Sequence, residues 1–258
     1  MTIRAVTFDC WGTLLAEPDV AASTAARVRA IAEAADGDLS PEQAQELLDA
    51  AWREHHLEWL GGRQYGSPGI ARYVAQELGN DAVIGLLQEA FEDAGRHGTT
   101  GAVAGARDTL IRLRERGIRT ALVCDAGMTP GRVVRDLLSN VGLLEHLEFC
   151  AFSDEIGVPK PSAKMFEAAL TAIVVEPHEA VHVGDLLRTD VDGGRAYGMK
   201  TIRITAVNDD VRQGFSWDES AVRERRDTTE EAPFHDADEV IASYDEFEDA
   251  LKRLEAAP

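Results

Sequence analysis

Short apolar runs alternate with amphipathic stretches along most of the chain, which predicts parallel strands connected by helices. The first run, residues 3–8, is rich in β-branched and aromatic residues, as buried parallel strands are. Further strands are expected at 119–123, 149–152, 181–183, 201–204 and, as an edge strand, 239–242. Helices are expected at 106–116, 130–138, 163–172, 189–197 and, closing the chain, 244–254. With right-handed crossovers this alternation gives an α/β fold built on a doubly wound parallel sheet.

Between residues 17 and 100 the pattern is helical instead. Residues 21–35 are alanine-rich with an apolar stripe, and residues 81–94 give one more helix. Ser40-Pro41-Glu42-Gln43 is typical of a helix start, with an N-cap, a proline at the first helical position and an acidic first turn. Ser67-Pro68 predicts another start. The sequence therefore predicts a block of helices inserted after the first strand.

Candidate chemistry gathers at the expected carboxyl ends of the strands, where open α/β sheets bind ligands. Asp9 ends the first strand, and Gly12-Thr13 then turns the chain. Cys124-Asp125 ends the second strand, and Gly157-Val158-Pro159-Lys160-Pro161 places a lysine in a stiff loop. Gly184-Asp185 follows the strand at 181–183, with Asp190 five residues further on. Taken singly, Asp185 and Asp190 also fit helix N-caps beside a strand–helix turn.

In this order and spacing the motifs resemble the haloacid dehalogenase (HAD) superfamily of phosphotransferases and dehalogenases, and the resemblance covers nearly the whole chain. It implies a Rossmann-like core made of residues 1–16 and 101–258. The helical block at 17–100 would be a helical-bundle cap domain. In the family, the cap closes over the active site and selects the substrate.

The resemblance also implies roles for the strand-end residues. Asp9 would be the nucleophile that attacks phosphorus or carbon and becomes an ester. Lys160 would pair with Asp9 and the transferring group, and Asp190 would orient Lys160 or a metal-bound water. The implied cofactor, Mg²⁺, would be held by Asp9, Asp185 and the backbone carbonyl of Trp11, an oxygen-only ligand set that suits this ion.

Cys124 stands where the family usually has Ser or Thr, whose hydroxyl binds a phosphoryl oxygen. A thiol is a much weaker donor, so either Cys124 takes this catalytic position or the backbone amides of Asp125 and Ala126 serve it. The alternative for Cys124 is a packed thiol at the strand end. Thr13 in the first turn and Arg132 near a helix start are candidate substrate-binding residues, and Arg132 fits a surface arginine equally well.

Trp11 departs from the phosphatase pattern and is a candidate substrate contact. Family phosphatases carry a second Asp here, as acid for the leaving group and base for the hydrolytic water, and indole cannot shuttle protons. Haloacid dehalogenases carry an aromatic residue here, because halide departs without a proton. Those enzymes need no metal, however, and typically have a Ser-x-Asn-like fourth motif, whereas Gly184-Asp185 with Asp190 is of the metal type.

Three functions therefore remain open. The first is a Mg²⁺-dependent phosphatase or phosphotransferase with an atypical catalytic set, acting through an aspartyl-phosphate. The second is a 2-haloacid dehalogenase. The third is a catalytically weakened protein that binds a phosphometabolite or a protein partner.

A polar and aromatic group gathers near Gly61-Gly62 in the helical block. It is either a substrate-specificity surface that faces Asp9 or a solvated helix end with a Trp in the cap core. Its members are Arg53, His55, His56, Trp59, Arg63 and Tyr65.

Composition limits the partners. The formal net charge of −20 argues against nucleic acid and anionic membranes. The partner that the resemblance implies is a small, phosphorylated molecule, which local cations would have to attract against this charge. Three cysteines without metal-ligand spacing suit reduced thiols, and no apolar run approaches the roughly 18 residues of a membrane span, so a cytoplasmic protein is expected. Residues 206–233 are highly charged and fit a solvated loop, a dimer contact or a flap, and the chain is expected to be a monomer or homodimer.

Overall fold

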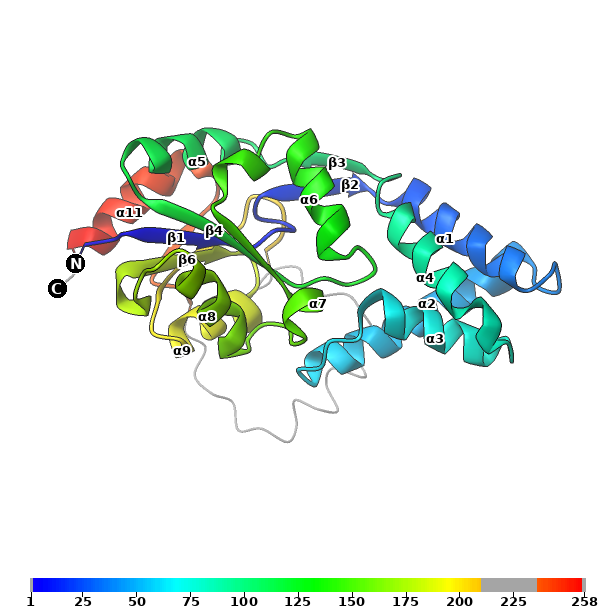
Figure 1. The fold of residues 1–258 in the computed structure, drawn as a ribbon. Coiled ribbons are helices and arrows are strands. Elements are labelled where there is room, and N and C mark those ends of the chain that lie inside the picture. Colours follow the sequence, from blue (N-terminus) through cyan, green and yellow to red (C-terminus); the bar gives the residue numbers. More distant parts are fainter. Residues whose placement is uncertain (1, 210–235, 257–258) are drawn as a thin grey trace.

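The structure is a computed structural model that describes residues 2–209 and 236–256; most of the charged segment expected at 206–233 lies outside the described residues. A parallel sheet with helices on both faces occupies one end of the molecule, and a group of four helices occupies the other (Figure 1). The α/β core with a helical cap is confirmed. None of the helices in the described ranges combines the length and apolar character that crossing a bilayer requires.

The core sheet has six strands, all parallel, in the order β5-β4-β1-β6-β7-β8. Their bounds are β1 Ala5–Phe8, β4 Arg119–Cys124, β5 Phe149–Phe152, β6 Ala180–Gly184, β7 Lys200–Ile204 and β8 Glu239–Ile241. Strand β1 lies between β4 and β6, so its carboxyl end meets theirs. This arrangement places the end of β1 at the centre of the edge where such sheets bind ligands.

Helices cover both faces of the sheet because successive side chains of each strand point to opposite sides. Val6 and Phe8 join a core cluster with residues of α5, α6 and α11, whereas Ala5 packs in a second cluster with residues of α8. The core helices are α5 Ala106–Glu115, α6 Gly131–Asn140, α7 Ser153–Ile156, α8 Ala163–Ala172, α9 Asp192–Ala196 and α11 Phe247–Ala256. Short 3-10 turns lie at Asp81–Val83, Leu144–His146, Pro177–Glu179 and Tyr244–Glu246.

The cap consists of α1 Ala21–Ala34, α2 Pro41–Leu60, α3 Gly66–Glu77 and α4 Ile84–Ala94. These helices enclose an apolar cluster of their own, which includes Ile31, Ile70 and Phe91. An antiparallel ribbon of β2 Leu15–Asp19 and β3 Thr99–Ala102 connects the cap to the core. The helical pattern expected from residue 17 to 100 is therefore wrong at both ends, where the chain is extended.

Two helix starts differ in outcome. The N-cap expected at Ser40 is confirmed, because its side chain and that of Gln43 form a reciprocal capping box at the start of α2. The start expected at Ser67 is wrong: α3 begins at Gly66, and the buried Ser67 hydroxyl donates instead to Glu92 Oε1 at 2.6 Å.

The helix expected at 189–197 is also different. Leu187–Val191 is a π-helical turn that precedes the short helix α9. Its cause is local, because Asp190 turns its Oδ2 back to accept the Leu186 N–H at 3.0 Å. This bond holds the Asp190 carboxylate at the end of β6.

Candidate active site

Three carboxylates meet at the carboxyl edge of the sheet. Asp9 follows β1, Asp185 follows the neighbouring strand β6, and Asp190 lies in the π-helical turn after Asp185. One oxygen from each lies within 4.8 Å of the others, and all three side chains are buried. The strand-end aspartates therefore form one cluster.

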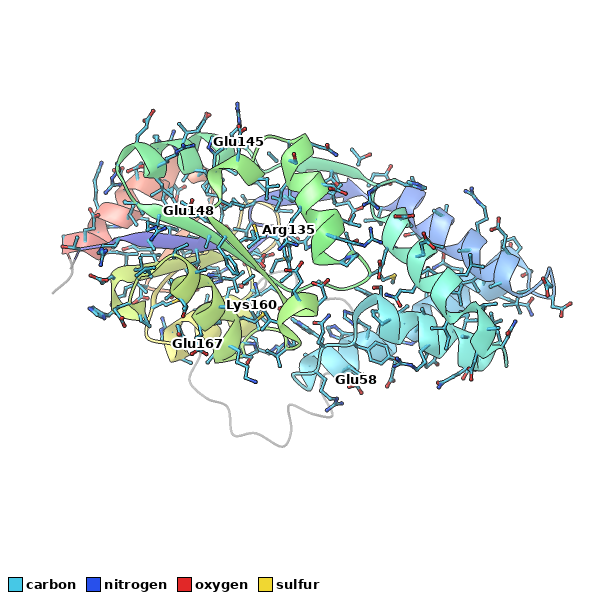
Figure 2. All side chains as sticks on the ribbon, viewed as in Figure 1. Glu58, Arg135, Glu145, Glu148, Lys160 and Glu167 are labelled. Carbon is cyan, nitrogen blue, oxygen red and sulfur yellow. The ribbon has the colours of Figure 1, made fainter. Side chains whose placement is uncertain are left out.

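Lys160 joins this cluster from the loop between α7 and α8 (Figure 2). Its ammonium lies 2.5 Å from Asp9 Oδ1 and 2.6 Å from Asp190 Oδ1, and the residue is only 2% exposed. Although burial alone would lower it, the Asp190 and Asp9 carboxylates raise the pKa of Lys160 well above its ordinary value. Lys160 is therefore a fixed positive charge between two carboxylates.

The three carboxylates differ in how readily they ionise. Burial raises the pKa of Asp9 to about 7, against the attraction of Lys160 and with added repulsion from Asp190. Burial and the Asp9 carboxylate likewise raise the pKa of Asp185. By contrast, Lys160 and His182 hold the pKa of Asp190 well below its ordinary value despite burial. Asp190 is thus the ionised partner of Lys160, while Asp9 and Asp185 carry excess negative charge at a cost.

Asp9 and Asp185 fit a divalent cation for this reason. They offer oxygen ligands side by side, and a cation between them would compensate the charge that burial penalises. The backbone of Gly12 passes close to the Asp185 carboxylate: a Cβ on Gly12 would lie 2.3 Å from Asp185 Oδ2. Gly12 also has φ +79°, so this turn needs glycine for both reasons.

Asn208 holds Asp185 in place and was not expected from the sequence. Its side-chain amide donates to Asp185 Oδ2 at 2.7 Å from a position just after β7, the strand beside β6. The sequence feature that could have indicated Asn208 is its position four residues beyond a buried strand, at the same sheet edge as the aspartates. The charged composition of the segment that follows concealed it.

His182 and Thr7 were also missed. Both are completely buried polar residues inside strands. A polar residue within an otherwise apolar strand is the sequence feature that could have indicated them. His182 lies 3.1 Å from Asp190 Oδ1 through Nε2, and 2.8 Å from the Thr7 hydroxyl through Nδ1. The carboxylate cluster is thus connected to the interior of the sheet.

Cys124 and the Ala126 amide, both expected to bind a phosphoryl oxygen, make contacts within the core instead. Cys124 is completely buried, and the contact with the Cys10 thiol together with burial raises its pKa, so the thiolate is disfavoured and a packed thiol describes it better. The backbone N–H of Ala126 already donates to the buried Ser153 hydroxyl at 2.8 Å. In this structure the Ala126 amide is therefore engaged within the core.

Asp125 links the core to the cap through its side chain. Its Oδ1 accepts the backbone N–H of Lys160 at 2.8 Å, and its Oδ2 accepts the indole N–H of Trp59, on cap helix α2, at 2.7 Å. Trp59 in turn stacks near His56, and the Arg188 guanidinium lies over the Trp59 ring at 4.0 Å. An aromatic side chain of the cap therefore contacts the loops that carry the site.

The remaining members of the cap group do not face the site in this way. His55 is buried, accepts the Gly66 N–H, and packs on Trp52; burial lowers the pKa of His55 to about 4. Arg63 pairs with Glu58 at the exposed end of α2, and Arg53 is exposed. Within the group, Trp59 and its neighbour His56 approach the core, and the others pack within the cap or lie at its surface.

Thr13, Trp11 and Arg132 complete the expected set. Thr13 is completely buried; its hydroxyl has no hydrogen-bond partner among the described residues, and its carbonyl accepts the Tyr244 hydroxyl at 3.1 Å. Trp11 is half-buried and packs against the sheet core. Arg132 is paired with Glu92 of α4 at 2.6 Å, so its guanidinium is engaged by the cap.

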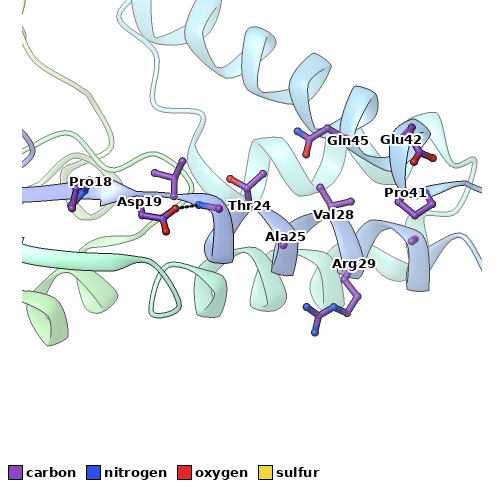
Figure 3. A pocket seen from close by; sticks show the side chains of 12 residues that line it. Pro18, Asp19, Thr24, Ala25, Val28, Arg29, Pro41, Glu42 and Gln45 are labelled. Carbon is purple, nitrogen blue, oxygen red and sulfur yellow. Dashed lines mark hydrogen bonds between the residues drawn. The ribbon is translucent and has the colours of Figure 1, made fainter.

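A groove of about 1070 Å³ lies elsewhere, on the cap beside α1 and the start of α2 (Figure 3). Its lining includes Asp19, Thr24, Arg29 and Gln45, and none of the strand-end aspartates or Lys160. The groove is therefore separate from the carboxylate cluster.

Fold and site together define an α/β protein with a helical cap and a buried cluster of carboxylates and one lysine at the carboxyl edge of its sheet. A family model described as haloacid dehalogenase-like hydrolase matches residues 3–198, and the chain belongs to this family. A protein from Bos taurus described as haloacid dehalogenase-like hydrolase domain-containing protein 3 is 34% identical over 139 residues, covering 51% of this chain and 54% of that protein. The chain thus spans about half the length of the first curated relatives.

A longer match exists to a protein from Methanopyrus kandleri described as glyceraldehyde 3-phosphate phosphatase. It is 32% identical over 212 residues, which is 78% of this chain and 84% of that protein. Among solved structures, a 2-haloacid dehalogenase from Pseudomonas syringae shares the fold, with a TM-score of 0.64, 23% identity and coverage of 98% of this chain and 99% of that one.

Proposed function

We propose that this chain is a Mg²⁺-dependent phosphatase or phosphotransferase that acts on a small phosphorylated molecule through an aspartyl-phosphate on Asp9. The observation that carries the proposal is the pairing of Asp9 with both a buried ammonium and a second carboxylate, Asp185. A nucleophile for a phosphate ester needs cations beside it, because the substrate itself is anionic. The relative from Methanopyrus kandleri, described as a phosphatase, supports the same choice.

In this proposal Asp9 attacks phosphorus with a carboxylate oxygen, and the bond from phosphorus to the leaving-group oxygen breaks. Lys160 balances the charge on the transferring group, since its ammonium already lies 2.5 Å from Asp9. Water then attacks the aspartyl-phosphate, which releases inorganic phosphate and restores the Asp9 carboxylate. An acceptor hydroxyl in place of water would make the reaction a phosphotransfer.

Mg²⁺ would be held by Asp9, Asp185 and the carbonyl of Trp11, and would supply charge compensation at the transferring group. Asn208 would orient the Asp185 carboxylate toward it. Asp190 would keep Lys160 in place, as its ionised carboxylate 2.6 Å from the ammonium supports.

A second candidate is a 2-haloacid dehalogenase, and the observation that favours it is Trp11. With an indole two residues after Asp9, that position supplies no proton to a leaving group. Asp9 would then attack carbon, and halide would leave unprotonated. The fold is common to both classes of enzyme, as the dehalogenase structure from Pseudomonas syringae illustrates.

A substrate panel tests these proposals together. Phosphometabolites and 2-haloacids are assayed with Mg²⁺ and with EDTA, using the wild type, Asp9→Asn and, as a control, Asp108→Asn on the exposed face of α5. We expect phosphate release that needs Mg²⁺, is abolished in Asp9→Asn and is unchanged in the control.

Other outcomes are distinct. Halide release that persists in EDTA selects the dehalogenase. Turnover retained by Asp9→Asn, with deamidation excluded by mass spectrometry, removes Asp9 from the mechanism. Absence of turnover on every substrate leaves a binding protein.

A further inference from the structure

The register of the sheet places His182 beside Thr7. Strands β1 and β6 pair in parallel with Thr7 opposite His182, two residues before Asp9 and three before Asp185. His182 packs edge-on against Phe166 of α8, at 5.1 Å between ring centroids, while its neighbours Val181 and Val183 belong to the core cluster on the opposite face. Its ring therefore lies on the same face of the strand pair as the Thr7 side chain, opposite that core cluster.

This ring forms the middle of a buried chain of polar contacts. Thr7 Oγ1 lies 2.8 Å from Nδ1, and Nε2 lies 3.1 Å from Asp190 Oδ1. The same Asp190 oxygen accepts from the Lys160 ammonium at 2.6 Å, and that ammonium also contacts Asp9. This series of hydrogen bonds runs from Thr7 through His182, Asp190 and Lys160 to Asp9, the proposed nucleophile.

The direction of each hydrogen bond follows from the acceptors. An ionised carboxylate only accepts, so the ring must carry a proton on Nε2 to bond Asp190. Burial lowers the pKa of His182, although the Asp190 carboxylate acts in the opposite direction, so a neutral ring with Nδ1 as an acceptor suits this site. The Thr7 hydroxyl then donates to Nδ1 and satisfies the remaining ring nitrogen of this tautomer.

We propose that His182, whose Nε2–H tautomer is completed by the Thr7 hydroxyl at Nδ1, is a positioning residue that aims Asp190 Oδ1 at Lys160. Asp190 is otherwise fixed through Oδ2, by the Leu186 N–H. Without the ring donor, Oδ1 would keep only the ammonium, which would move toward Asp190 and away from Asp9. The effect on turnover rests on the roles proposed above for Lys160 and Asp190, whereas the tautomer does not.

The first experiment reads the ring directly. Two-bond ¹H–¹⁵N correlation spectra of the protein labelled with ¹⁵N-histidine assign the tautomer, with His182→Gln identifying the signal. We expect the Nε2–H form in the wild type and in Thr7→Ser, which keeps the hydroxyl. In Thr7→Val, where Nδ1 loses its donor, this single form gives way to a doubly protonated or mixed ring. An Nδ1–H or doubly protonated ring in the wild type overturns the proposal, even in an active enzyme.

The second experiment measures turnover. His182→Leu removes the donor, and His182→Gln keeps an N–H near the place of Nε2. Losing a hydrogen bond to a charged group costs about tenfold to a hundredfold, so we expect that loss in kcat for Leu with KM little changed. Gln should recover most of it, and in an Asp190→Asn background the difference between His182 and Leu should disappear.

Equal losses for Leu and Gln, or losses that simply add to that of Asp190→Asn, would make His182 a packing residue and overturn the proposal. If His182→Leu fails to fold, the pair Thr7→Ser and Thr7→Val carries the kinetic comparison, with only Val expected to lower kcat. Failure of the proposed function can be distinguished from failure of this proposal. If the enzyme acts only on haloacids, the same kinetic comparison is made with a haloacid. If the protein has no turnover, the ring spectra still test the tautomer.

Discussion

Trp11 is the residue whose chemistry differs most from what the proposed reaction asks for. It is half-buried against the core of the sheet and stands two residues after Asp9, where indole provides neither an acid nor a base. Leaving groups that depart as stable anions should therefore react fastest. We expect acyl and aryl phosphates to outpace alkyl phosphates, with a steep fall in rate as the leaving-group pKa rises.

Trp11→Asp places a carboxyl group at the same position, with Trp11→Phe as the matched aromatic control. We expect Asp, and not Phe, to recover part of the roughly 10²–10⁴ that general acid–base catalysis provides, and to flatten the dependence on leaving-group pKa. The cavity left by the indole limits the gain. A dependence that is already flat in the wild type would mean that another group, such as His56 beside Trp59, transfers the proton.

The positions of some site residues could be predicted from the parallel direction of the strands. Parallel strands end at one edge, so Asp9 and Asp185 had to lie close together once the strands were recognised. Asn208 and Ser153 could not be assigned in the same way, because each acts across the sheet on a residue far away in sequence. The Ser153 hydroxyl contacts the Ala126 amide from the end of β5, and no sequence pattern near either residue predicts that contact.

At the scale of elements, helix α2 of the cap contacts the core through the indole of Trp59. Trp59→Phe keeps the aromatic ring and removes the N–H that Asp125 accepts at 2.7 Å. Because Asp125 also holds the backbone of Lys160, the loss loosens both cap docking and the lysine loop. We expect kcat/KM to fall about tenfold or more, as for a lost hydrogen bond to a carboxylate, chiefly through KM.

Steady-state kinetics on the substrate found in the panel measure this effect, and hydrogen exchange along α2 should increase in parallel. Tyr73→Phe is the control, since it removes an aromatic hydroxyl from a residue that packs within the cap. Unchanged kinetics and exchange in Trp59→Phe would show that the indole bond does not hold the cap to the core.

The elements themselves were predictable where periodicity is strong. Strands buried on both faces and helices such as α8, with its apolar stripe, were recognisable, and the last edge strand and closing helix followed from the same alternation. The ribbon of β2 and β3 was not, because its partly exposed residues Ala16, Pro18 and Gly101 are poor strand formers. The π-helical turn was hidden because a side-chain bond from Asp190, and not propensity, shapes it.

At the scale of the whole molecule, ion pairs connect the cap to the core. Arg132 of α6 pairs with Glu92 of α4, and Arg96, just after α4, pairs with Asp136 of α6. With a formal net charge of −20, the anionic substrate proposed above would approach against the overall field, and local cations such as Lys160 would have to attract it. Charge at the junction of cap and core therefore matters for both stability and access.

Glu92 gives this junction a defined pH dependence. Although burial alone would raise it, hydrogen bonds from Ser67 and Gln88 and the Arg132 guanidinium hold the pKa of Glu92 below its ordinary value. A carboxyl with a lowered folded-state pKa stabilises the protein fully above its unfolded pKa, and loses this contribution as the pH falls through the folded value.

Glu92→Gln should therefore lower the free energy of unfolding by about 1 kcal/mol near neutral pH, the order expected for a partly exposed ion pair. The difference from the wild type should shrink as the pH falls below about 4, where the carboxylate of the unfolded chain is protonated and the folded one follows. Urea unfolding of both proteins across this range measures it, with Glu89→Gln on the exposed face of α4 as the control. A difference that stays constant with pH would assign the effect to the hydrogen-bond geometry around Ser67, because an amide keeps the shape of the carboxyl but has no charge to lose.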